Sequence, residues 1–289
     1  MNFIDTIKLI RANQWYKNLV IFLSLIFGKE LFNLFAFQQT IIGFLALCLI
    51  SSSNYIINDI IDIKKDRNNP EKKNRPLASG SIKIWQALII FLFLLLLGLY
   101  ISFSLSKIFF IFVLTLLTFT QLYSFILKNE IFADILLISL NFVIRTVSGS
   151  FVITKGIEPY IKISSWLILC PFFLALFLVT SKRESEILLL QNEAKQHKKI
   201  LIGYTKKLTF ALMIISTVLL ISSYSLYVFF SSYPNLMFTL PFVLYLIFRF
   251  FNFVETKSAI ARHPELLYKD KRSVITILII IIITFFSIY

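Results

Sequence analysis

The chain has 289 residues, of which 58% are hydrophobic and 16% aromatic, and its formal net charge is +14. So apolar a composition excludes a soluble domain and predicts an integral membrane protein. In a soluble protein the positive charge would suggest nucleic acid, but here we expect membrane topology to explain most of it and expect no nucleic-acid partner.

A partly polar arm, residues 3–18, precedes a series of apolar segments, and we expect no cleavable signal peptide before them. Each segment is close to the ~20 residues that a helix needs to cross a bilayer. They fall near residues 19–37, 40–61, 84–104, 107–127, 131–153, 163–181, 208–230, 235–253 and 273–289. The sequence therefore predicts an all-α polytopic membrane protein, one domain over residues 1–289, with about nine transmembrane helices around a cytoplasm-facing polar cavity.

Lysine and arginine residues are distributed unevenly between the two sides of these helices. If the N-terminus is cytoplasmic, the segments on its side hold 24 of them, with Arg249 near the end of the range 235–253 included. The opposite connections hold four, namely Lys29, Lys107, Lys155 and Lys162. Because cytoplasmic loops are enriched in Lys and Arg, we expect an inner (cytoplasmic) membrane protein with a cytoplasmic N-terminus. With nine spans the C-terminus would lie outside.

Three of the six aspartates, Asp59, Asp62 and Asp66, lie within eight positions at the end of the second segment. On a helix, Asn58, Asp62 and Asp66 are spaced i, i+4, i+8 and form one polar stripe, with Asp59 beside it. Their oxygens suit Mg²⁺ held through one or two carboxylates and substrate phosphates. Taken alone, the cluster fits a solvated stop to a transmembrane helix equally well.

The segment 131–153 carries Asp134, Asn141 and Arg145 on nearly one face. Arg145 is roughly 20 Å into the membrane at 1.5 Å per residue. An arginine at that depth costs at least ~2.5 kcal/mol unless it is paired or hydrated. A structural ion pair or a snorkelling side chain would account for it. We favour a guanidinium that lines a polar cavity and binds a phosphate.

Further basic and polar residues lie at the cytoplasmic helix ends. Anchoring to anionic lipid is the simpler explanation for Lys195 to Lys207, and interfacial anchoring for Trp15 and Tyr16. No nucleophile elbow, Walker loop, dinucleotide fingerprint or HExxH motif occurs in the sequence. Acidic residues with a metal, framed by Lys and Arg, are therefore the phosphate-handling chemistry that the sequence offers.

These motifs resemble the UbiA superfamily of intramembrane prenyltransferases. The run Asn58-Asp59-x-x-Asp62-x-x-x-Asp66 matches its first Asp-rich motif, and Asp66-Arg67-x-x-Pro70-x-Lys72-x-x-Arg75-Pro76-Leu-Ala-Ser-Gly80 continues the match. The opening Arg11-x-x-Gln14-Trp15-x-Lys17-Asn18 and the turn Tyr123-Ser-x-x-Leu-Lys128 extend the resemblance over nearly the whole chain.

One departure distinguishes the subfamily. Aromatic prenyltransferases of this superfamily carry a second Asp-rich motif, whereas this chain has no aspartate between Asp134 and Asp270. The corresponding loop begins Lys182-Arg183-x-x-Glu186. That pattern is similar to decaprenyl-phosphate phosphoribosyltransferases, which act in cell-wall precursor synthesis.

The resemblance implies Mg²⁺-dependent transfer of 5-phosphoribose from phosphoribosyl diphosphate (PRPP) to a polyprenyl phosphate of the decaprenyl type, with release of pyrophosphate. It implies catalytic roles for Asp59, Asp62, Asp66 and Arg145, and Mg²⁺ ligation by Asn58, Asp62 and Asp66. The implied substrate-binding residues are Lys17, Asn18, Arg67, Lys72, Lys73, Arg75, Tyr123, Lys128, Asp134, Asn141, Lys182, Arg183 and Glu186.

Two alternatives remain open at this point. A UbiA enzyme of the usual kind would alkylate an aromatic ring with a prenyl diphosphate, and the missing second motif argues against it. A non-enzymatic lipid-phosphate carrier would need polar groups on both sides of the membrane, and here they crowd one side. The sequence determines neither the prenyl chain length nor the oligomeric state. A homo-oligomer is one of the states that it leaves open.

Overall fold

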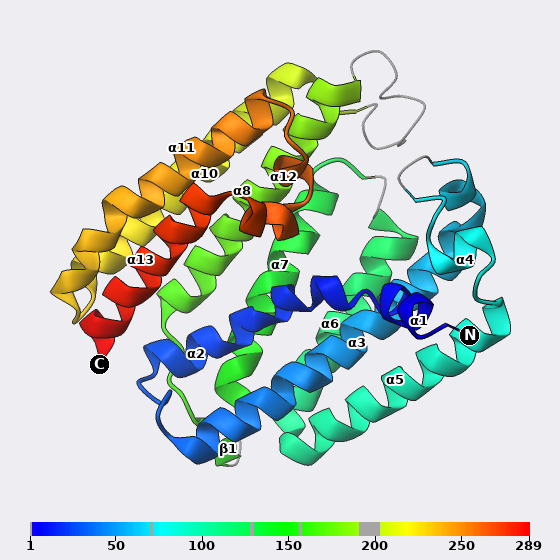
Figure 1. Ribbon diagram of the computed structural model, residues 1–289. Helices are drawn as coiled ribbons and strands as arrows, with labels where there is room; N and C mark the ends of the chain where they lie inside the picture. Colours follow the sequence, from blue (N-terminus) through cyan, green and yellow to red (C-terminus); the bar gives the residue numbers. More distant parts are fainter. Residues whose placement is uncertain (1, 70–71, 128–129, 156–157, 191–202) are drawn as a thin grey trace. The chain divides into compact units, whose positions relative to one another are not determined.

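A computed structural model describes residues 2–69, 72–127, 130–155, 158–190 and 203–289, and these are almost entirely helical (Figure 1). The elements are α1 (Phe3–Leu9), η1 (Ala12–Ile21), α2 (Phe22–Phe27), α3 (Leu34–Arg67), α4 (Pro76–Ser79), α5 (Ile84–Leu105), α6 (Lys107–Phe125), α7 (Ala133–Ser148), η3 (Gly149–Phe151), β1 (Thr154–Lys155), β2 (Glu158–Pro159), α8 (Ser165–Leu190), α10 (Lys206–Phe230), η6 (Pro234–Thr239), α11 (Leu240–Glu255), α12 (Ala259–Arg262), η7 (Pro264–Lys269) and α13 (Lys271–Ile288). The strands β1 and β2 form a small antiparallel pair.

The all-α membrane fold is confirmed, but the expected number of nine transmembrane helices is not. Among the described residues, eight helices are long and apolar enough to cross a membrane. The range 19–37 is not one helix: it holds the end of the 3₁₀ helix η1, the short α2, a turn at Gly28 to Asn33 and the start of α3. The turn forms where Lys29 adopts a left-handed conformation with a φ of 60°.

The chain forms two compact units. The first contains Met1–Ile126 and Ile144–Ile163, and the second contains Leu127–Val143 and Ser164–Tyr289. The helix α7 therefore begins in the second unit and ends in the first. Each unit has its own apolar core and its own set of charged residues.

In the first unit, the N-terminal segment runs antiparallel to α3 (Figure 1). Phe22 packs against Phe44 with ring centroids 5.8 Å apart, and Leu25 shares a buried cluster with Ala36. On its other sides α3 packs against α5 and α6. Long α3 continues past this packed region, and its last turns carry the aspartates predicted to form the site.

A close backbone contact joins η1 and α2 to the end of α7. Ser24 Oγ donates to the carbonyl of Thr146 at 2.8 Å. At Gly149 a Cβ atom would lie 2.2 Å from the carbonyl oxygen of Ile21, so only glycine allows this approach. The contact holds the end of α7 beside η1.

In the second unit, α8 packs against α10, α11 and α12, and α13 packs against α11 and η6. The core contains Phe177, Met213, Phe250 and Val254. Arg249 of α11 donates through Nε to Asp270 Oδ2 at 2.6 Å, and Asp270 also caps the N-terminus of α13 through the Ser273 amide at 3.0 Å. This arrangement joins two helices at one charged point.

Candidate functional site

The predicted acidic cluster forms at the end of α3, and a single arginine joins two of its members. Asp59 and Asp66 are both 3% exposed. Arg75 Nη1 donates to Asp59 Oδ1 at 3.0 Å and to Asp66 Oδ2 at 2.6 Å. Arg75 lies immediately before α4, where Pro76 begins the helix, and Gly80 ends it with a φ of 81°. This short helix therefore places the guanidinium over the acidic face of α3.

Other basic residues surround the same carboxylates. Arg11 donates to Asp59 and stacks over the ring of Tyr55 at 4.8 Å. Lys72 Nζ lies 3.7 Å from Asp66 Oδ1. Asp62 is half-buried, and Lys65 Nζ lies 3.7 Å from its carboxylate. The aspartates are thus ion-paired with residues from the N-terminal arm, from α3 itself and from the connection to α5.

The donor set fits Mg²⁺ together with a phosphate ligand. Within the described residues, no three His, Cys, Asp or Glu side chains come close enough to hold a metal ion by themselves. Asn58 and Asp62, both half-buried, share the face of α3 that carries Asp66. One amide and two carboxylates are a set that Mg²⁺ completes with water and substrate phosphates.

Arg145 lies in a buried polar cluster beside the part of α3 that precedes the aspartates. Its Nε donates to Asn18 Oδ1 at 2.9 Å, and Ser51 Oγ lies 3.3 Å from the same oxygen. Asn18 Nδ2 donates to Cys48 Sγ at 3.3 Å. Asn18, predicted to bind substrate, therefore contacts Arg145 directly, and η1 holds both beside α3.

The polar face of α3 is longer than the Asp-rich motif indicates. Ser52 accepts from Trp15 Nε1 at 3.0 Å and donates to the carbonyl of Ile10 at 2.8 Å. Cys48, Ser52, Tyr55 and Asp59 continue the face at helical spacing, and each contacts the N-terminal segment. Of the two expected interfacial anchors, Trp15 thus contacts the polar face of α3, whereas Tyr16 is exposed.

The other residues of the first unit that were predicted to bind substrate are Lys17, Arg67, Lys73 and Tyr123. Arg67 is exposed and donates through Nε to the carbonyl of Ala78 at 3.1 Å. Lys17 is half-buried beside the Tyr16 ring at 5.9 Å. Lys73 is exposed and Tyr123 is half-buried, while Lys128 falls outside the described residues.

In the second unit, three of the residues predicted to bind substrate, Asp134, Arg183 and Glu186, form a buried network. Asp134 is fully buried and accepts from Arg183 Nε at 2.9 Å and from the Tyr204 hydroxyl at 2.7 Å. Arg183 Nη1 donates to Glu186 Oε2 at 2.7 Å. Burial and the hydrogen bond to Asp134 raise the pKa of Tyr204, so its hydroxyl stays protonated. Two carboxylates therefore fix the position of the Arg183 guanidinium.

Neighbouring residues in this unit differ in their surroundings. Lys182 is half-buried, and Asn141 is 8% exposed on the helix that carries Asp134. Glu184 is 1% exposed and accepts from Thr209.

Sequence reasoning did not assign Arg11, Gln121 or Tyr204 to a site. Arg11 belongs to the N-terminal motif, but its partner Asp59 lies 48 positions away in the sequence. Gln121 Nε2 donates to Asn54 Oδ1 at 2.6 Å between α6 and α3. A polar residue inside an apolar segment was the available signal for Gln121 and Asn54. Tyr204 offered no such signal.

The fold and these charged clusters define an all-helical integral membrane protein with polar residues built into its transmembrane helices. A sequence profile of the UbiA prenyltransferase family matches residues 19–264. The chain belongs to the UbiA prenyltransferase family, and it is a membrane-embedded transferase.

Curated relatives carry a more specific name. The chain is 29% identical to the decaprenyl-phosphate phosphoribosyltransferase of Mycolicibacterium smegmatis, over 81% of this chain and 73% of that protein. It is 32% identical to the enzyme of that name from Corynebacterium glutamicum, over 69% of this chain and 59% of that protein.

Solved structures agree with the fold. A UbiA homolog from Archaeoglobus fulgidus bound to DMAPP and Mg²⁺ matches with a TM-score of 0.72 and 16% identity, covering 98% of each chain. The same kind of homolog bound to GPP and Mg²⁺ matches with a TM-score of 0.70 and 14% identity, covering 97% of this chain and 99% of that one. At such identity the likeness shows the fold alone.

Proposed function

We propose that this protein transfers 5-phosphoribose from PRPP to a polyprenyl phosphate at the cytoplasmic side of the inner membrane and releases pyrophosphate. The observation that carries the proposal is the buried ion-pair network around Arg183 near the end of α8. There Arg183 is fixed between Asp134 and Glu186, in a stretch without aspartate where an aromatic prenyltransferase would have its second acidic motif. The names of the curated relatives support the same activity.

In this proposal the end of α3 binds the diphosphate of PRPP. Asn58, Asp62 and Asp66 would hold Mg²⁺, which supplies Lewis-acid neutralisation of the charge that develops on the leaving pyrophosphate. On the same face of α3, Asp66 is paired with Arg75 and Lys72, and Asp59 is paired with Arg11. When a diphosphate enters, these cations exchange a carboxylate for a phosphate oxygen, a partner that a guanidinium binds in bidentate geometry.

The remaining cations serve the two monophosphates. Arg145 is positioned by Asn18 deep beside α3. Lys182 is half-buried and directly precedes the fixed Arg183 in α8. The acceptor phosphate is already ionised at neutral pH, so the reaction needs no strong general base. The protein's contribution is positioning and electrostatic stabilisation.

The test is an assay with purified protein, Mg²⁺, PRPP labelled in the ribose and a polyprenyl phosphate. We expect a labelled lipid and an equal amount of pyrophosphate. A parallel reaction uses a prenyl diphosphate in place of PRPP and an aromatic acceptor in place of the polyprenyl phosphate. Product in the second reaction alone would identify an aromatic prenyltransferase. Binding of polyprenyl phosphate without pyrophosphate release in either reaction would favour a carrier.

A further inference from the structure

The first unit has a cleft on the side of α3 that carries Arg67, next to the acidic face. It has a volume of about 530 Å³ and lies between the end of α3, α4 and the start of α5. Arg67 follows Asp66 by one position, which on a helix turns its side chain by about 100° from the aspartate. The cleft is therefore separate from the site proposed for the diphosphate.

Two cations lie at the rim of this cleft. Arg67 is held by its Nε hydrogen bond to the carbonyl of Ala78, and Lys83 precedes the first turn of α5. Both are exposed, and the described lining of the cleft contains no acidic residue. Its electrostatic complement is an anion.

Apart from these cations, the described lining of the cleft is mostly apolar. It includes Ile63, Leu77, Ile84, Trp85 and Leu88. Trp85 is 58% exposed and Leu88 is 43% exposed, so both face outward.

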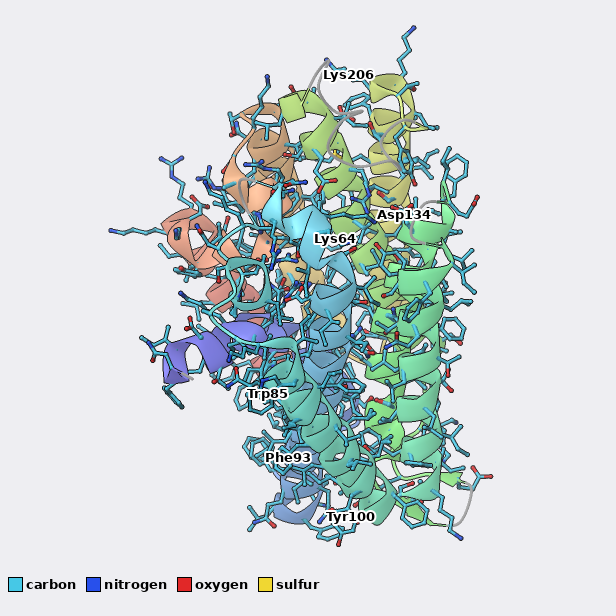
Figure 2. All side chains as sticks on the ribbon, turned by 90° about the vertical axis from the view of Figure 1, so that its right-hand side faces the viewer. Lys64, Trp85, Phe93, Tyr100, Asp134 and Lys206 are labelled. Atoms are coloured by element: carbon cyan, nitrogen blue, oxygen red, sulfur yellow. The ribbon has the colours of Figure 1, made fainter. Side chains whose placement is uncertain are left out.

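Figure 2 shows that Trp85, Phe93 and Tyr100 follow one another along the outward side of α5. Trp85 and Tyr100 are roughly 22 Å apart at 1.5 Å per residue. Tryptophan and tyrosine concentrate at the two surfaces of a bilayer, with apolar residues between them. Trp85 therefore marks the membrane surface on the side where α3 ends. The cations lie at headgroup level and the apolar wall lies at the level of acyl chains.

We propose that this cleft binds one anionic phospholipid, with the phosphate between Arg67 and Lys83 and an acyl chain along Ile84 and Leu88. Basic pockets at the ends of transmembrane helices bind anionic lipid headgroups in this way. A zwitterionic lipid would gain less from the two cations. A free phosphate would gain nothing from the apolar wall.

Binding at this cleft would also act on the diphosphate site. Leu77, in the cleft wall, and Ala78, which accepts from Arg67, both belong to α4. Arg75 directly precedes α4 and bridges Asp59 and Asp66. A lipid that holds Arg67 and Leu77 in place would therefore reduce the mobility of the segment that carries Arg75.

The test uses delipidated full-length protein titrated with phosphatidylglycerol or phosphatidylcholine, with bound lipid counted by native mass spectrometry. We expect tight binding of one phosphatidylglycerol. We expect Lys83→Glu to lower its affinity at least fivefold without changing phosphatidylcholine binding. Leu88→Trp should lower the affinity for both lipids by filling the apolar part of the cleft. Millimolar inorganic phosphate should not compete.

Lys107→Glu is the matched control, because Lys107 is also an exposed lysine and begins α6 at the far end of α5. Unchanged phosphatidylglycerol affinity in both Lys83→Glu and Leu88→Trp would overturn the proposal. An equal loss in Lys107→Glu would overturn it as well, because the preference would then reflect total charge. Efficient competition by inorganic phosphate would replace the lipid with a soluble anion.

Discussion

Asp59, Asp62 and Asp66 share one face of α3, but their surroundings give them different tasks. Asp59 and Asp66 are buried and joined by Arg75. Asp62 is more exposed, and its partner Lys65 is 79% exposed at the side chain. An exposed pair of this kind contributes at most about 1 kcal/mol to stability. Asp62 is therefore the aspartate whose replacement separates activity from folding.

We predict that Asp62→Asn lowers kcat/KM for PRPP at least a hundredfold, because a Mg²⁺ ligand is lost, while the melting temperature stays within about 2 °C of wild type. Asp66→Asn should lower both, since Arg75 then loses a buried partner. Steady-state kinetics and thermal unfolding in detergent measure the two effects. Lys65→Ala serves as the control, and wild-type turnover in Asp62→Asn would remove Asp62 from the metal site.

Arg145 and Asn18 form a second pair whose functions differ. We predict that Arg145→Ala lowers kcat/KM at least tenfold, which corresponds to about 1.4 kcal/mol of transition-state stabilisation. Asn18→Ala should lower it less, because the guanidinium remains but loses one positioning hydrogen bond. Asn18→Asp keeps an acceptor at that position and should restore part of the loss. An unchanged ratio in Arg145→Ala would leave Arg145 with a structural role only.

Among the elements, α11 and α13 depend on one charged residue at their junction. Hydrogen bonds from Arg249 and from Ser273 hold the pKa of Asp270 well below its usual range. Because the folded pKa is lowered, the stabilisation is present above the unfolded pKa of about 3.9 and is lost as the pH falls below it.

We predict that Asp270→Asn lowers the melting temperature at pH 7, because Arg249 loses its carboxylate partner, whereas the N-cap is kept, since Asn caps a helix as well as Asp does. The difference from wild type should shrink as the pH falls below about 4, because there the Asp270 carboxylate takes up a proton in the unfolded chain while it stays ionised in the folded protein. Melting curves of both proteins between pH 3 and pH 8 measure this. A constant difference across that range would contradict the assignment.

The elements that the sequence predicts best are those with long apolar segments. The ranges 84–104 and 107–127 correspond closely to α5 and α6, because ~20 apolar residues between charged turns permit little else in a membrane. The first segment was predicted least well, since hydropathy does not distinguish a 3₁₀ helix from an α-helix. The acidic cluster was predicted from spacing along one helix. Its counter-charges were not, because Arg11 and Arg75 reach it through tertiary contacts.

At the scale of the whole molecule, the N-terminal segment formed by η1 and α2 decides how many times the chain crosses the membrane. A 3₁₀ helix rises about 2.0 Å per residue, so the ten residues of η1 and the six of α2 span roughly 29 Å. The hydrocarbon core of a bilayer is about 30 Å thick. The segment also runs antiparallel to α3, from Arg11 beside Asp59 to Leu25 beside Ala36.

We therefore predict that η1 and α2 cross the membrane as a ninth span, in addition to the eight longer helices. The N-terminus would then lie in the cytoplasm and the C-terminus outside, consistent with the distribution of lysine and arginine. Fusions of a cytoplasmic fluorescent reporter and a periplasmic phosphatase to each terminus measure this. Activity of the same reporter at both termini would contradict a ninth crossing.

The ion pairs on α3 have a consequence for the order of binding. Three carboxylates, Asp59, Asp62 and Asp66, face four cations, Arg11, Lys65, Lys72 and Arg75. Their formal sum is positive, so an isolated Mg²⁺ ion meets no net attraction there. A diphosphate bound there, as we propose, would reverse that balance: it would draw the guanidinium groups away from the aspartates and bring its own negative charge. Donor and metal would then enter as one complex, and the cellular concentration of the donor, rather than of Mg²⁺, would set how much enzyme is loaded.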